Sequence, residues 1–232
     1  MIRRFLDFLT KRQTAFVVFG YAIAAYFLLL GWDGFTALQK MGYVLYLGLC
    51  LHQLEEYCFP GGFLWGLNTV LGTHDAMRWP GDRLSAGLCD IIATSVGLYF
   101  IVFQLTPFIA CCFAFLGLIE FLVHTMMGFI LRARLKHKGK STIYVPGTAS
   151  CWLLFLPVSC VVLTIVIQDQ ILSISQIGIA AACVIAFLGA TVILPVLFLQ
   201  DKNSVYTYAN LPGFYQKYLN KERGNYYEEN KA

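Results

Sequence analysis

Six long apolar segments limit what this chain can fold into more than any other feature of its sequence. A helix that crosses a bilayer needs about 20 mostly apolar residues, and the segments that qualify are 14–32, 40–58, 84–106, 107–131, 147–168 and 172–200. Thr106-Pro107 separates the third segment from the fourth, because proline cannot continue a helical hydrogen-bond ladder. Only 13% of the residues are charged, whereas about 25% is usual in soluble domains. The sequence therefore predicts an all-α bundle of about six transmembrane helices in one domain, residues 1–200.

The lysines and arginines predict the orientation of this bundle. If six segments cross the membrane, all 17 basic residues except Lys40 fall on one side. Basic residues are enriched in cytoplasmic loops, so both termini are expected in the cytoplasm. We expect a multi-pass protein of the inner (plasma) membrane, with the lipid bilayer as its first partner.

The two ends of the chain lie outside the apolar segments. Residues 1–12 place apolar and charged side chains on opposite helical faces, which suits a short amphipathic helix at the membrane surface; a frayed terminus is the alternative. Residues 201–232 are polar and rich in tyrosine. Because tyrosine favours the headgroup region, we expect a cytoplasmic tail that rests against the membrane rather than a separate domain.

Ionisable side chains inside the apolar segments are the best lead to function. Each costs roughly 2.5–3.5 kcal/mol at the centre of a bilayer even on lenient scales, and this chain carries His52, Glu55, Glu56, Asp90, Glu120 and His124. Residues three or four apart share a helical face, so the first three form one group and the last two another. At 1.5 Å per residue, the six-span topology places them all roughly 9–10 Å below the cytoplasmic boundary.

Two kinds of chemistry make such a layer tolerable. Imidazole and carboxylate groups suit zinc, iron or manganese, and a divalent metal would be held by His52, Glu56, Glu120 and His124, with Glu55 as a further ligand or a support. Alternatively, His52 pairs with Glu120 and His124 with Glu56, which leaves groups suited to acid/base catalysis. Both interpretations predict a membrane-embedded enzyme that acts on a hydrophobic or lipid-like substrate through these five residues.

Other functions fit the same residues. A transporter would use the carboxylates to bind a proton or a cation, although no internal repeat of the kind common in transporters is visible. A non-catalytic partner subunit would use the polar side chains to hold helices together. Asp90 belongs to the layer or faces the membrane surface instead. No nucleic-acid-binding motif is present.

The loops contain two further candidates. Loop 59–83 contains His74 and either covers the cluster as a lid or simply connects two helices. The basic run 132–140 is typical of a solvated cytoplasmic loop.

The run His52-Gln53-Leu54-Glu55-Glu56 resembles the signature of the HXXEE family of bacterial integral membrane proteins, a family without a settled activity. The resemblance covers most of residues 45–150 and includes Phe59-Pro60 and the run from Tyr144 to Thr148. It implies a membrane protein and points to His52, Glu55 and Glu56, but it implies no reaction. In residue type and spacing alone, His52, Glu56 and Glu120 also resemble the site of emopamil-binding-type sterol isomerases, which implies that metal-free isomerisation is chemically reasonable.

Overall fold

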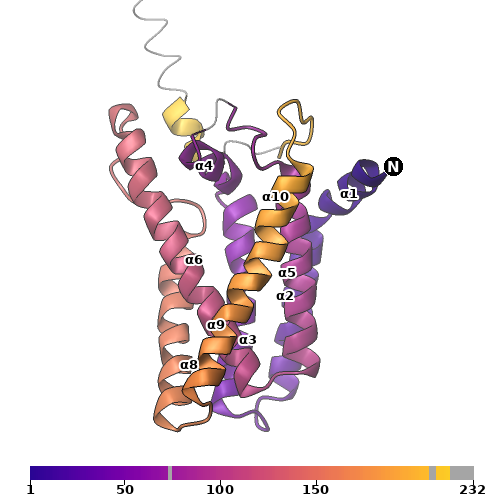
Figure 1. The fold of residues 1–232 in the computed structure, drawn as a ribbon, viewed down its shortest axis with the longest axis vertical. Coiled ribbons are helices and arrows are strands. Elements are labelled where there is room, and N and C mark those ends of the chain that lie inside the picture. Colours follow the sequence, from indigo (N-terminus) through magenta and orange to yellow (C-terminus); the bar gives the residue numbers. More distant parts are fainter. Residues whose placement is uncertain (73–74, 209–212, 220–232) are drawn as a thin grey trace, which may run out of the picture.

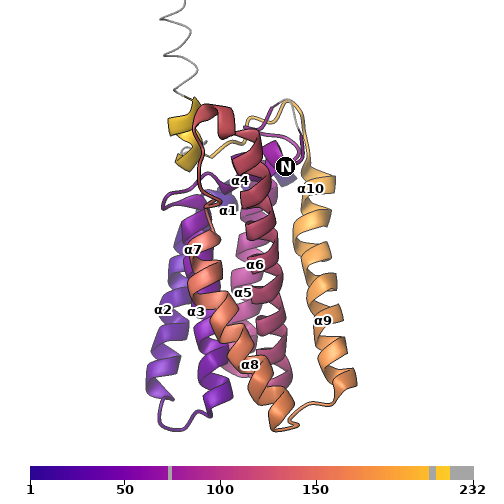
Figure 2. The same ribbon diagram turned by 90° about the vertical axis from the view of Figure 1, so that its left-hand side faces the viewer.

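Helical rods stand side by side in the computed structural model of the protein, which describes residues 1–72, 75–208 and 213–219 (Figures 1 and 2). The rods are α2 (Gln13–Leu30), α3 (Ala37–Tyr57), α5 (Arg83–Phe103), α6 (Pro107–Arg134), and the segments Thr148–Gln168 and Ile174–Leu199. No strand occurs among the described residues. The predicted all-α class is confirmed, and the rods begin and end within a few residues of the predicted segments.

Length and composition distinguish α3 from the other rods. Among the described residues, five helices are long and apolar enough to cross a membrane, and α3 is not one of them. It has 21 residues, but it carries Lys40, His52, Glu55 and Glu56. The structure therefore shows a bundle with five candidate membrane spans around a less apolar sixth helix.

Side-chain caps fix where several rods begin. Capping boxes start α3 at Thr36, α5 at Asp82 and α9 (Ile174–Leu188) at Ser173, and each satisfies backbone N–H groups that have no partner within the helix. Thr106 accepts a hydrogen bond from the backbone of Ile109 at the start of α6. The predicted break at Thr106-Pro107 is confirmed, since α5 ends at Phe103.

The last two rods each contain a π-helical turn next to a proline. In the fifth rod, α7 (Thr148–Ser150) leads into the π-turn η2 (Cys151–Phe155) and then α8 (Leu156–Gln168). In the sixth, α9 leads into η3 (Gly189–Ile193) and then α10 (Leu194–Leu199). Pro157 and Pro195 follow these turns directly. A proline ring clashes with the carbonyl four residues earlier, and the wider π-turn makes room for it, so each rod continues past its proline.

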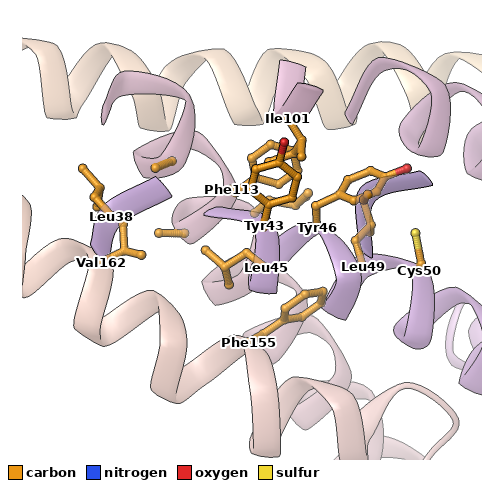
Figure 3. Close-up of a cluster of buried hydrophobic side chains, with 14 of the residues drawn as sticks. Leu38, Tyr43, Leu45, Tyr46, Leu49, Cys50, Ile101, Phe113, Phe155 and Val162 are labelled. Carbon is orange, nitrogen blue, oxygen red and sulfur yellow. The ribbon is translucent and has the colours of Figure 1, made fainter. Parts of the chain in front are cut away.

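The apolar core surrounds α3. Its side chains Tyr43, Leu45 and Tyr46 are at most 2% exposed, and they meet residues of α5, α6, η2 and α8 (Figure 3). The Tyr46 hydroxyl donates a hydrogen bond to the Thr94 carbonyl oxygen at 3.0 Å. Since protein encloses α3 on several sides, its polar residues are shielded from lipid.

One end of the bundle gathers both described ends of the chain. The helix α1 (Ile2–Thr10), the short helix α4 (Phe63–Val70) and the segment after α10 all lie there (Figure 1). Arg3 pairs with Asp201 at 2.7 Å, and Arg83 pairs with Asp7. The predicted helix at the N-terminus is confirmed as a helix, with Ile2, Phe5 and Phe8 exposed.

The basic loop after α6 differs from the expectation at Lys140. This side chain is only 1% exposed, although the run was predicted to be solvated. Its Nζ donates to the Tyr144 carbonyl oxygen at 2.5 Å and lies 5.0 Å from the Phe214 ring centre and 5.7 Å from that of Tyr218. The prediction is wrong here because the tail segment 213–219, distant in sequence, folds over this lysine. Tyr226 and Tyr227 lie outside the described residues.

Burial predicts a pH-dependent stability at Lys140. Burial, and to a lesser degree the nearby Lys217, lowers the pKa of Lys140 from its ordinary 10.5 to about 8. Between these two values the unfolded chain holds a proton that the folded chain releases, so the contribution of Lys140 to stability rises with pH from about 8 to 10.5. Between these pH values, the melting temperature of the native protein in detergent should therefore rise relative to that of Lys140→Met.

The exposed Lys136 provides the matched control. Lys136→Met should keep the pH dependence of the native chain, whereas Lys140→Met should lose part of it. Equal slopes in both variants would mean that Lys140 ionises as freely in the folded chain as in the unfolded one.

Candidate functional site

Two histidines and two glutamates from α3 and α6 meet inside the bundle. Glu56 Oε1 lies 3.5 Å from His52 Nε2 and 3.1 Å from His124 Nε2, and Glu120 Oε2 lies 3.8 Å and 3.7 Å from the same two nitrogens. Each helix supplies one histidine and one glutamate four residues apart, so that both pairs lie on facing sides. The structure thus brings together four of the six residues singled out in the sequence.

Burial is nearly complete at this four-residue centre. The side chains of His124, His52 and Glu56 are 0%, 3% and 7% exposed, whereas Glu120 is 21% exposed. The two imidazole rings meet edge to face with centres 4.7 Å apart. Each carboxylate faces both imidazoles, which gives four contacts. The predicted pairs, His52 with Glu120 and His124 with Glu56, are two of these four.

Glu55 faces away from this centre and holds the start of the fifth rod. Its Oε1 accepts hydrogen bonds from Tyr144 Oη at 2.9 Å and the Ala149 backbone N–H at 3.0 Å. Its Oε2 accepts from the backbone N–H and the hydroxyl of Ser150, at 2.9 and 2.7 Å. The carboxylate therefore fixes the loop that enters the membrane segment at α7.

Ser150 connects Glu55 to His52. Its Oγ lies 2.9 Å from His52 Nδ1 and 3.0 Å from the Gly147 carbonyl oxygen. The single hydroxyl proton goes to the carboxylate, which is the nearest and strongest acceptor. His52 Nδ1 then carries a hydrogen and donates it to Ser150. In a neutral His52 this leaves the lone pair of Nε2 facing the carboxylates of Glu56 and Glu120, an arrangement that a cation at the centre would stabilise.

Sequence reasoning missed Ser150, Gly147 and Phe63. Only the resemblance at residues 144–148 hinted that this region approaches the cluster. Gly147 has φ +96°, and a Cβ there would lie 2.2 Å from His124 Cε1. Phe63, at the start of α4, stacks on the His124 ring with centres 5.0 Å apart. Loop 59–83 thus covers the cluster through Phe63; His74 lies outside the described residues.

His124 is fully buried; its Nδ1 has no hydrogen-bond partner within the described part of the chain, whereas its Nε2 lies 3.1 Å from Glu56 Oε1. An unsatisfied buried polar group costs about 1–3 kcal/mol. Such a group in a folded protein commonly marks a place for an ion or a water molecule. The geometry therefore leaves Nδ1 of His124 without a partner and sets its Nε2 beside the Glu56 carboxylate.

Cys151 provides another donor beside the two histidines. His52, His124 and Cys151 each offer a ligand atom, and these atoms lie within 4.8 Å of one another. The Cys151 sulfur lies 3.7 Å from His52 Nδ1, on the side of the ring that Ser150 already occupies. The two glutamates face the free Nε2 atoms and are the better complement to them.

Asp90 belongs to a neighbouring polar group. It is only 4% exposed, which disagrees with the second of the two alternatives, that it faces the membrane surface. Gln13 of α2 donates a hydrogen bond to its carboxylate, and the Tyr208 hydroxyl donates to Gln13 Oε1 at 2.6 Å. Gln53, next to His52 in sequence, donates to the Asp90 carbonyl oxygen at 3.4 Å. Asp90 thus joins α2, α5 and the tail.

Comparison with known proteins gives one finding. A family model described as "Protein of unknown function with HXXEE motif" matches residues 43–162, which is more than half of the 232 residues. The matched region contains all four residues of the centre, the whole of α6 and Ser150. No curated protein and no solved structure matches the chain.

The packing at Gly147 predicts that Gly147→Ala destabilises the protein. The added Cβ would collide with the His124 ring, and the positive φ disfavours any residue with a Cβ. We expect a loss of about 1–3 kcal/mol in the free energy of unfolding, measured by denaturant titration in detergent.

Gly178, in α9, is the control, because a Cβ there meets nothing within 4 Å. Gly178→Ala should leave stability unchanged or raise it by about 0.5–1 kcal/mol. A Gly147→Ala protein as stable as the native chain would show that the two imidazoles are not held against this loop.

Proposed function

The chain belongs to the HXXEE family, and we propose that it is a membrane-embedded enzyme with a divalent metal at the four-residue centre. The metal would be zinc, iron or manganese, bound by His52, Glu56, Glu120 and His124. The substrate would be a hydrophobic or lipid-like molecule.

The convergence of four donor atoms carries this proposal. Each imidazole Nε2 at the centre lies 3.1–3.8 Å from an oxygen of each carboxylate. Two ligands at roughly 2.0–2.1 Å from one tetrahedral zinc ion would lie roughly 3.3–3.4 Å apart. These separations suit a single shared cation, to which His124 Nε2 would be one ligand. Imidazole with carboxylate suits iron and manganese as well.

Metal chemistry accounts for the division of roles among the residues. A bound metal polarises a substrate oxygen or activates water. Glu120, the most exposed of the four, borders the side from which a substrate would arrive. Glu55 and Ser150 would hold the His52 ring with Nε2 towards the centre, in the manner of residues that orient metal-bound histidines.

The proposed setting is a six-span bundle in the inner (plasma) membrane with both termini in the cytoplasm. The 21 residues of α3 correspond to about 31 Å at 1.5 Å per residue, similar to the hydrocarbon thickness of about 30 Å. The surrounding helices shield its polar residues, which supports α3 as a sixth span. The described basic residues other than Lys40 lie at the end of the bundle that carries α1 and α4, which supports this orientation.

Acid/base catalysis without a metal is a second candidate, favoured by the hydrogen-bonded series Glu55, Ser150 and His52. A carboxylate that orients a histidine through its Nδ1 side leaves Nε2 able to take a proton from a substrate. Glu56 and Glu120 would then stabilise the resulting imidazolium.

Metal analysis of the purified protein separates the two candidates. We expect one zinc, iron or manganese ion per chain in the native protein, and loss of this ion in His124→Ala because a ligand is removed. Glu120→Gln, which keeps the shape of the side chain, should also lower the metal content. Elemental analysis by mass spectrometry measures both.

His137→Ala is the matched control, because His137 is exposed in η1 (Lys136–Lys138). It should keep the metal. Native protein that is folded and free of metal would favour the acid/base candidate. If membranes with the native chain and with Glu56→Gln also have the same lipid composition, the enzyme proposal itself fails.

The contact of Ser150 with His52 predicts a graded effect on affinity. Ser150→Ala should weaken metal binding by about 10–100-fold, the range usual for residues that orient a metal ligand. Chelator competition measures this. Ser159→Ala removes a buried hydroxyl that has no hydrogen-bond partner among the described residues and should leave affinity unchanged; equal affinities in the two variants would contradict the orienting role of Ser150.

A further inference from the structure

An apolar cavity of about 270 Å³ lies between α5, α6 and α9. Its wall includes Ala93 and Val96 of α5, Cys112 and Leu116 of α6, and Phe187 of α9, with Leu49 of α3 at its inner side. Apolar groups and thiols line it. None of its lining residues takes part in the polar contacts of the candidate site.

The nearest part of the cavity lies one helical turn deeper in the bundle than the polar residues, and its lining extends further in that direction. Leu49 precedes His52 by three residues, and Leu116 precedes Glu120 by four. On α5, which runs in the opposite direction, Ala93 follows Asp90 by three. All three offsets point away from the end with α1 and α4, by about 4.5–6 Å at 1.5 Å per residue. The cavity thus continues below the centre, and Glu120 is the centre's least buried member.

The cavity opens between the helices towards the surroundings of the bundle. α9 packs on α6, whereas η3 and α10 pack on α5, so the last rod changes neighbours along its slanted course (Figure 1). Cys183 of α9 is exposed at this opening, and Val96, Phe100 and Phe187 are half-buried. A molecule in the bilayer would reach the cavity sideways, without passing through water.

We infer that this cavity holds the hydrocarbon chain of the substrate while the substrate's polar group lies at Glu120. The inference rests on the proposed function and names its substrate class, a single-chain lipid with a reactive polar group. The volume lies below the roughly 300–1,000 Å³ of pockets that enclose drug-sized ligands. It suits one flexible chain better than a rigid multi-ring skeleton.

The polar centre and the apolar cavity would contribute differently to binding, because the solvent around the bundle would be lipid. Lipid tails are as apolar as the cavity wall, so burial alone gives no net attraction in a bilayer. The polar centre would supply the affinity, and the cavity would select the shape of the attached chain. A chain that fits would place the polar group next to Glu120.

Photolabelling tests this inference. The full-length protein, reconstituted in phosphatidylcholine vesicles, is exposed to a fatty acid that carries a diazirine within its chain, and labelled peptides are identified by mass spectrometry. We expect label on the cavity-lining parts of α5 and α9, reduced several-fold by excess unlabelled fatty acid. Ala93→Phe, which fills the cavity from α5, should reduce this labelling several-fold, as should Val96→Phe.

Ala186→Phe is the matched control, because Ala186 is exposed on α9 and does not line the cavity. It should keep the labelling. Label spread evenly over all lipid-facing helices, or labelling that Ala93→Phe leaves intact, would overturn the inference. So would a sterol diazirine that labels the cavity in preference to the fatty acid.

Metal content keeps this result separate from the proposed function. Ala93→Phe should retain the metal of the native protein, because Ala93 does not contact the four-residue centre. If the protein contains metal but the label is uniform, only the inference about the cavity fails. If the cavity is labelled specifically but the protein contains no metal, only the proposed metal centre fails.

Discussion

The burial of two imidazoles and two carboxylates among apolar helices is the constraint on which the rest of the structure depends. Such groups are tolerable in a membrane protein only where they satisfy one another or a bound ion. α3 and α6 must therefore face each other at the level of His52 and His124. Gly147 and Phe63 then close the space around the rings, and Glu55 fixes the loop that brings Gly147 there. The buried polar side chains therefore constrain how the helices and loops around them pack, just as this packing fixes the side chains.

α3 is the least apolar of the rods, and its position in the bundle explains why. A helix that faces lipid must be apolar over most of its surface, whereas one enclosed by other helices can carry polar residues on the enclosed faces. Tyr43, Tyr46, His52 and Glu56 are all buried within the protein. The low hydropathy of this helix thus reflects its enclosure by other parts of the protein.

Much of the fold follows from the sequence because its signals are local. Apolar length and the caps at Thr36, Thr106 and Ser173 determine the rods, and the four-residue spacing of the histidines and glutamates predicts two facing pairs. The roles of Ser150, Phe63 and Lys140 depend on contacts between segments far apart in the chain. Asp90 shows the same limit, since its partner Gln13 is 77 positions away. No periodicity encodes such a pairing, so only the assembled bundle reveals it.

The π-turn at Gly189–Ile193 gives the last rod a mechanical weak point. A π-turn interrupts the regular hydrogen-bond ladder, and Pro195 donates no backbone bond of its own. Bending at this place strains fewer hydrogen bonds than bending elsewhere along the rod. α10 packs against α5, and α9 packs against α6. A bend at this π-turn would therefore move α9 while α10 stays in place on α5. The separation of α9 from α5, which sets the width of the lateral opening, would change with any bend at this π-turn.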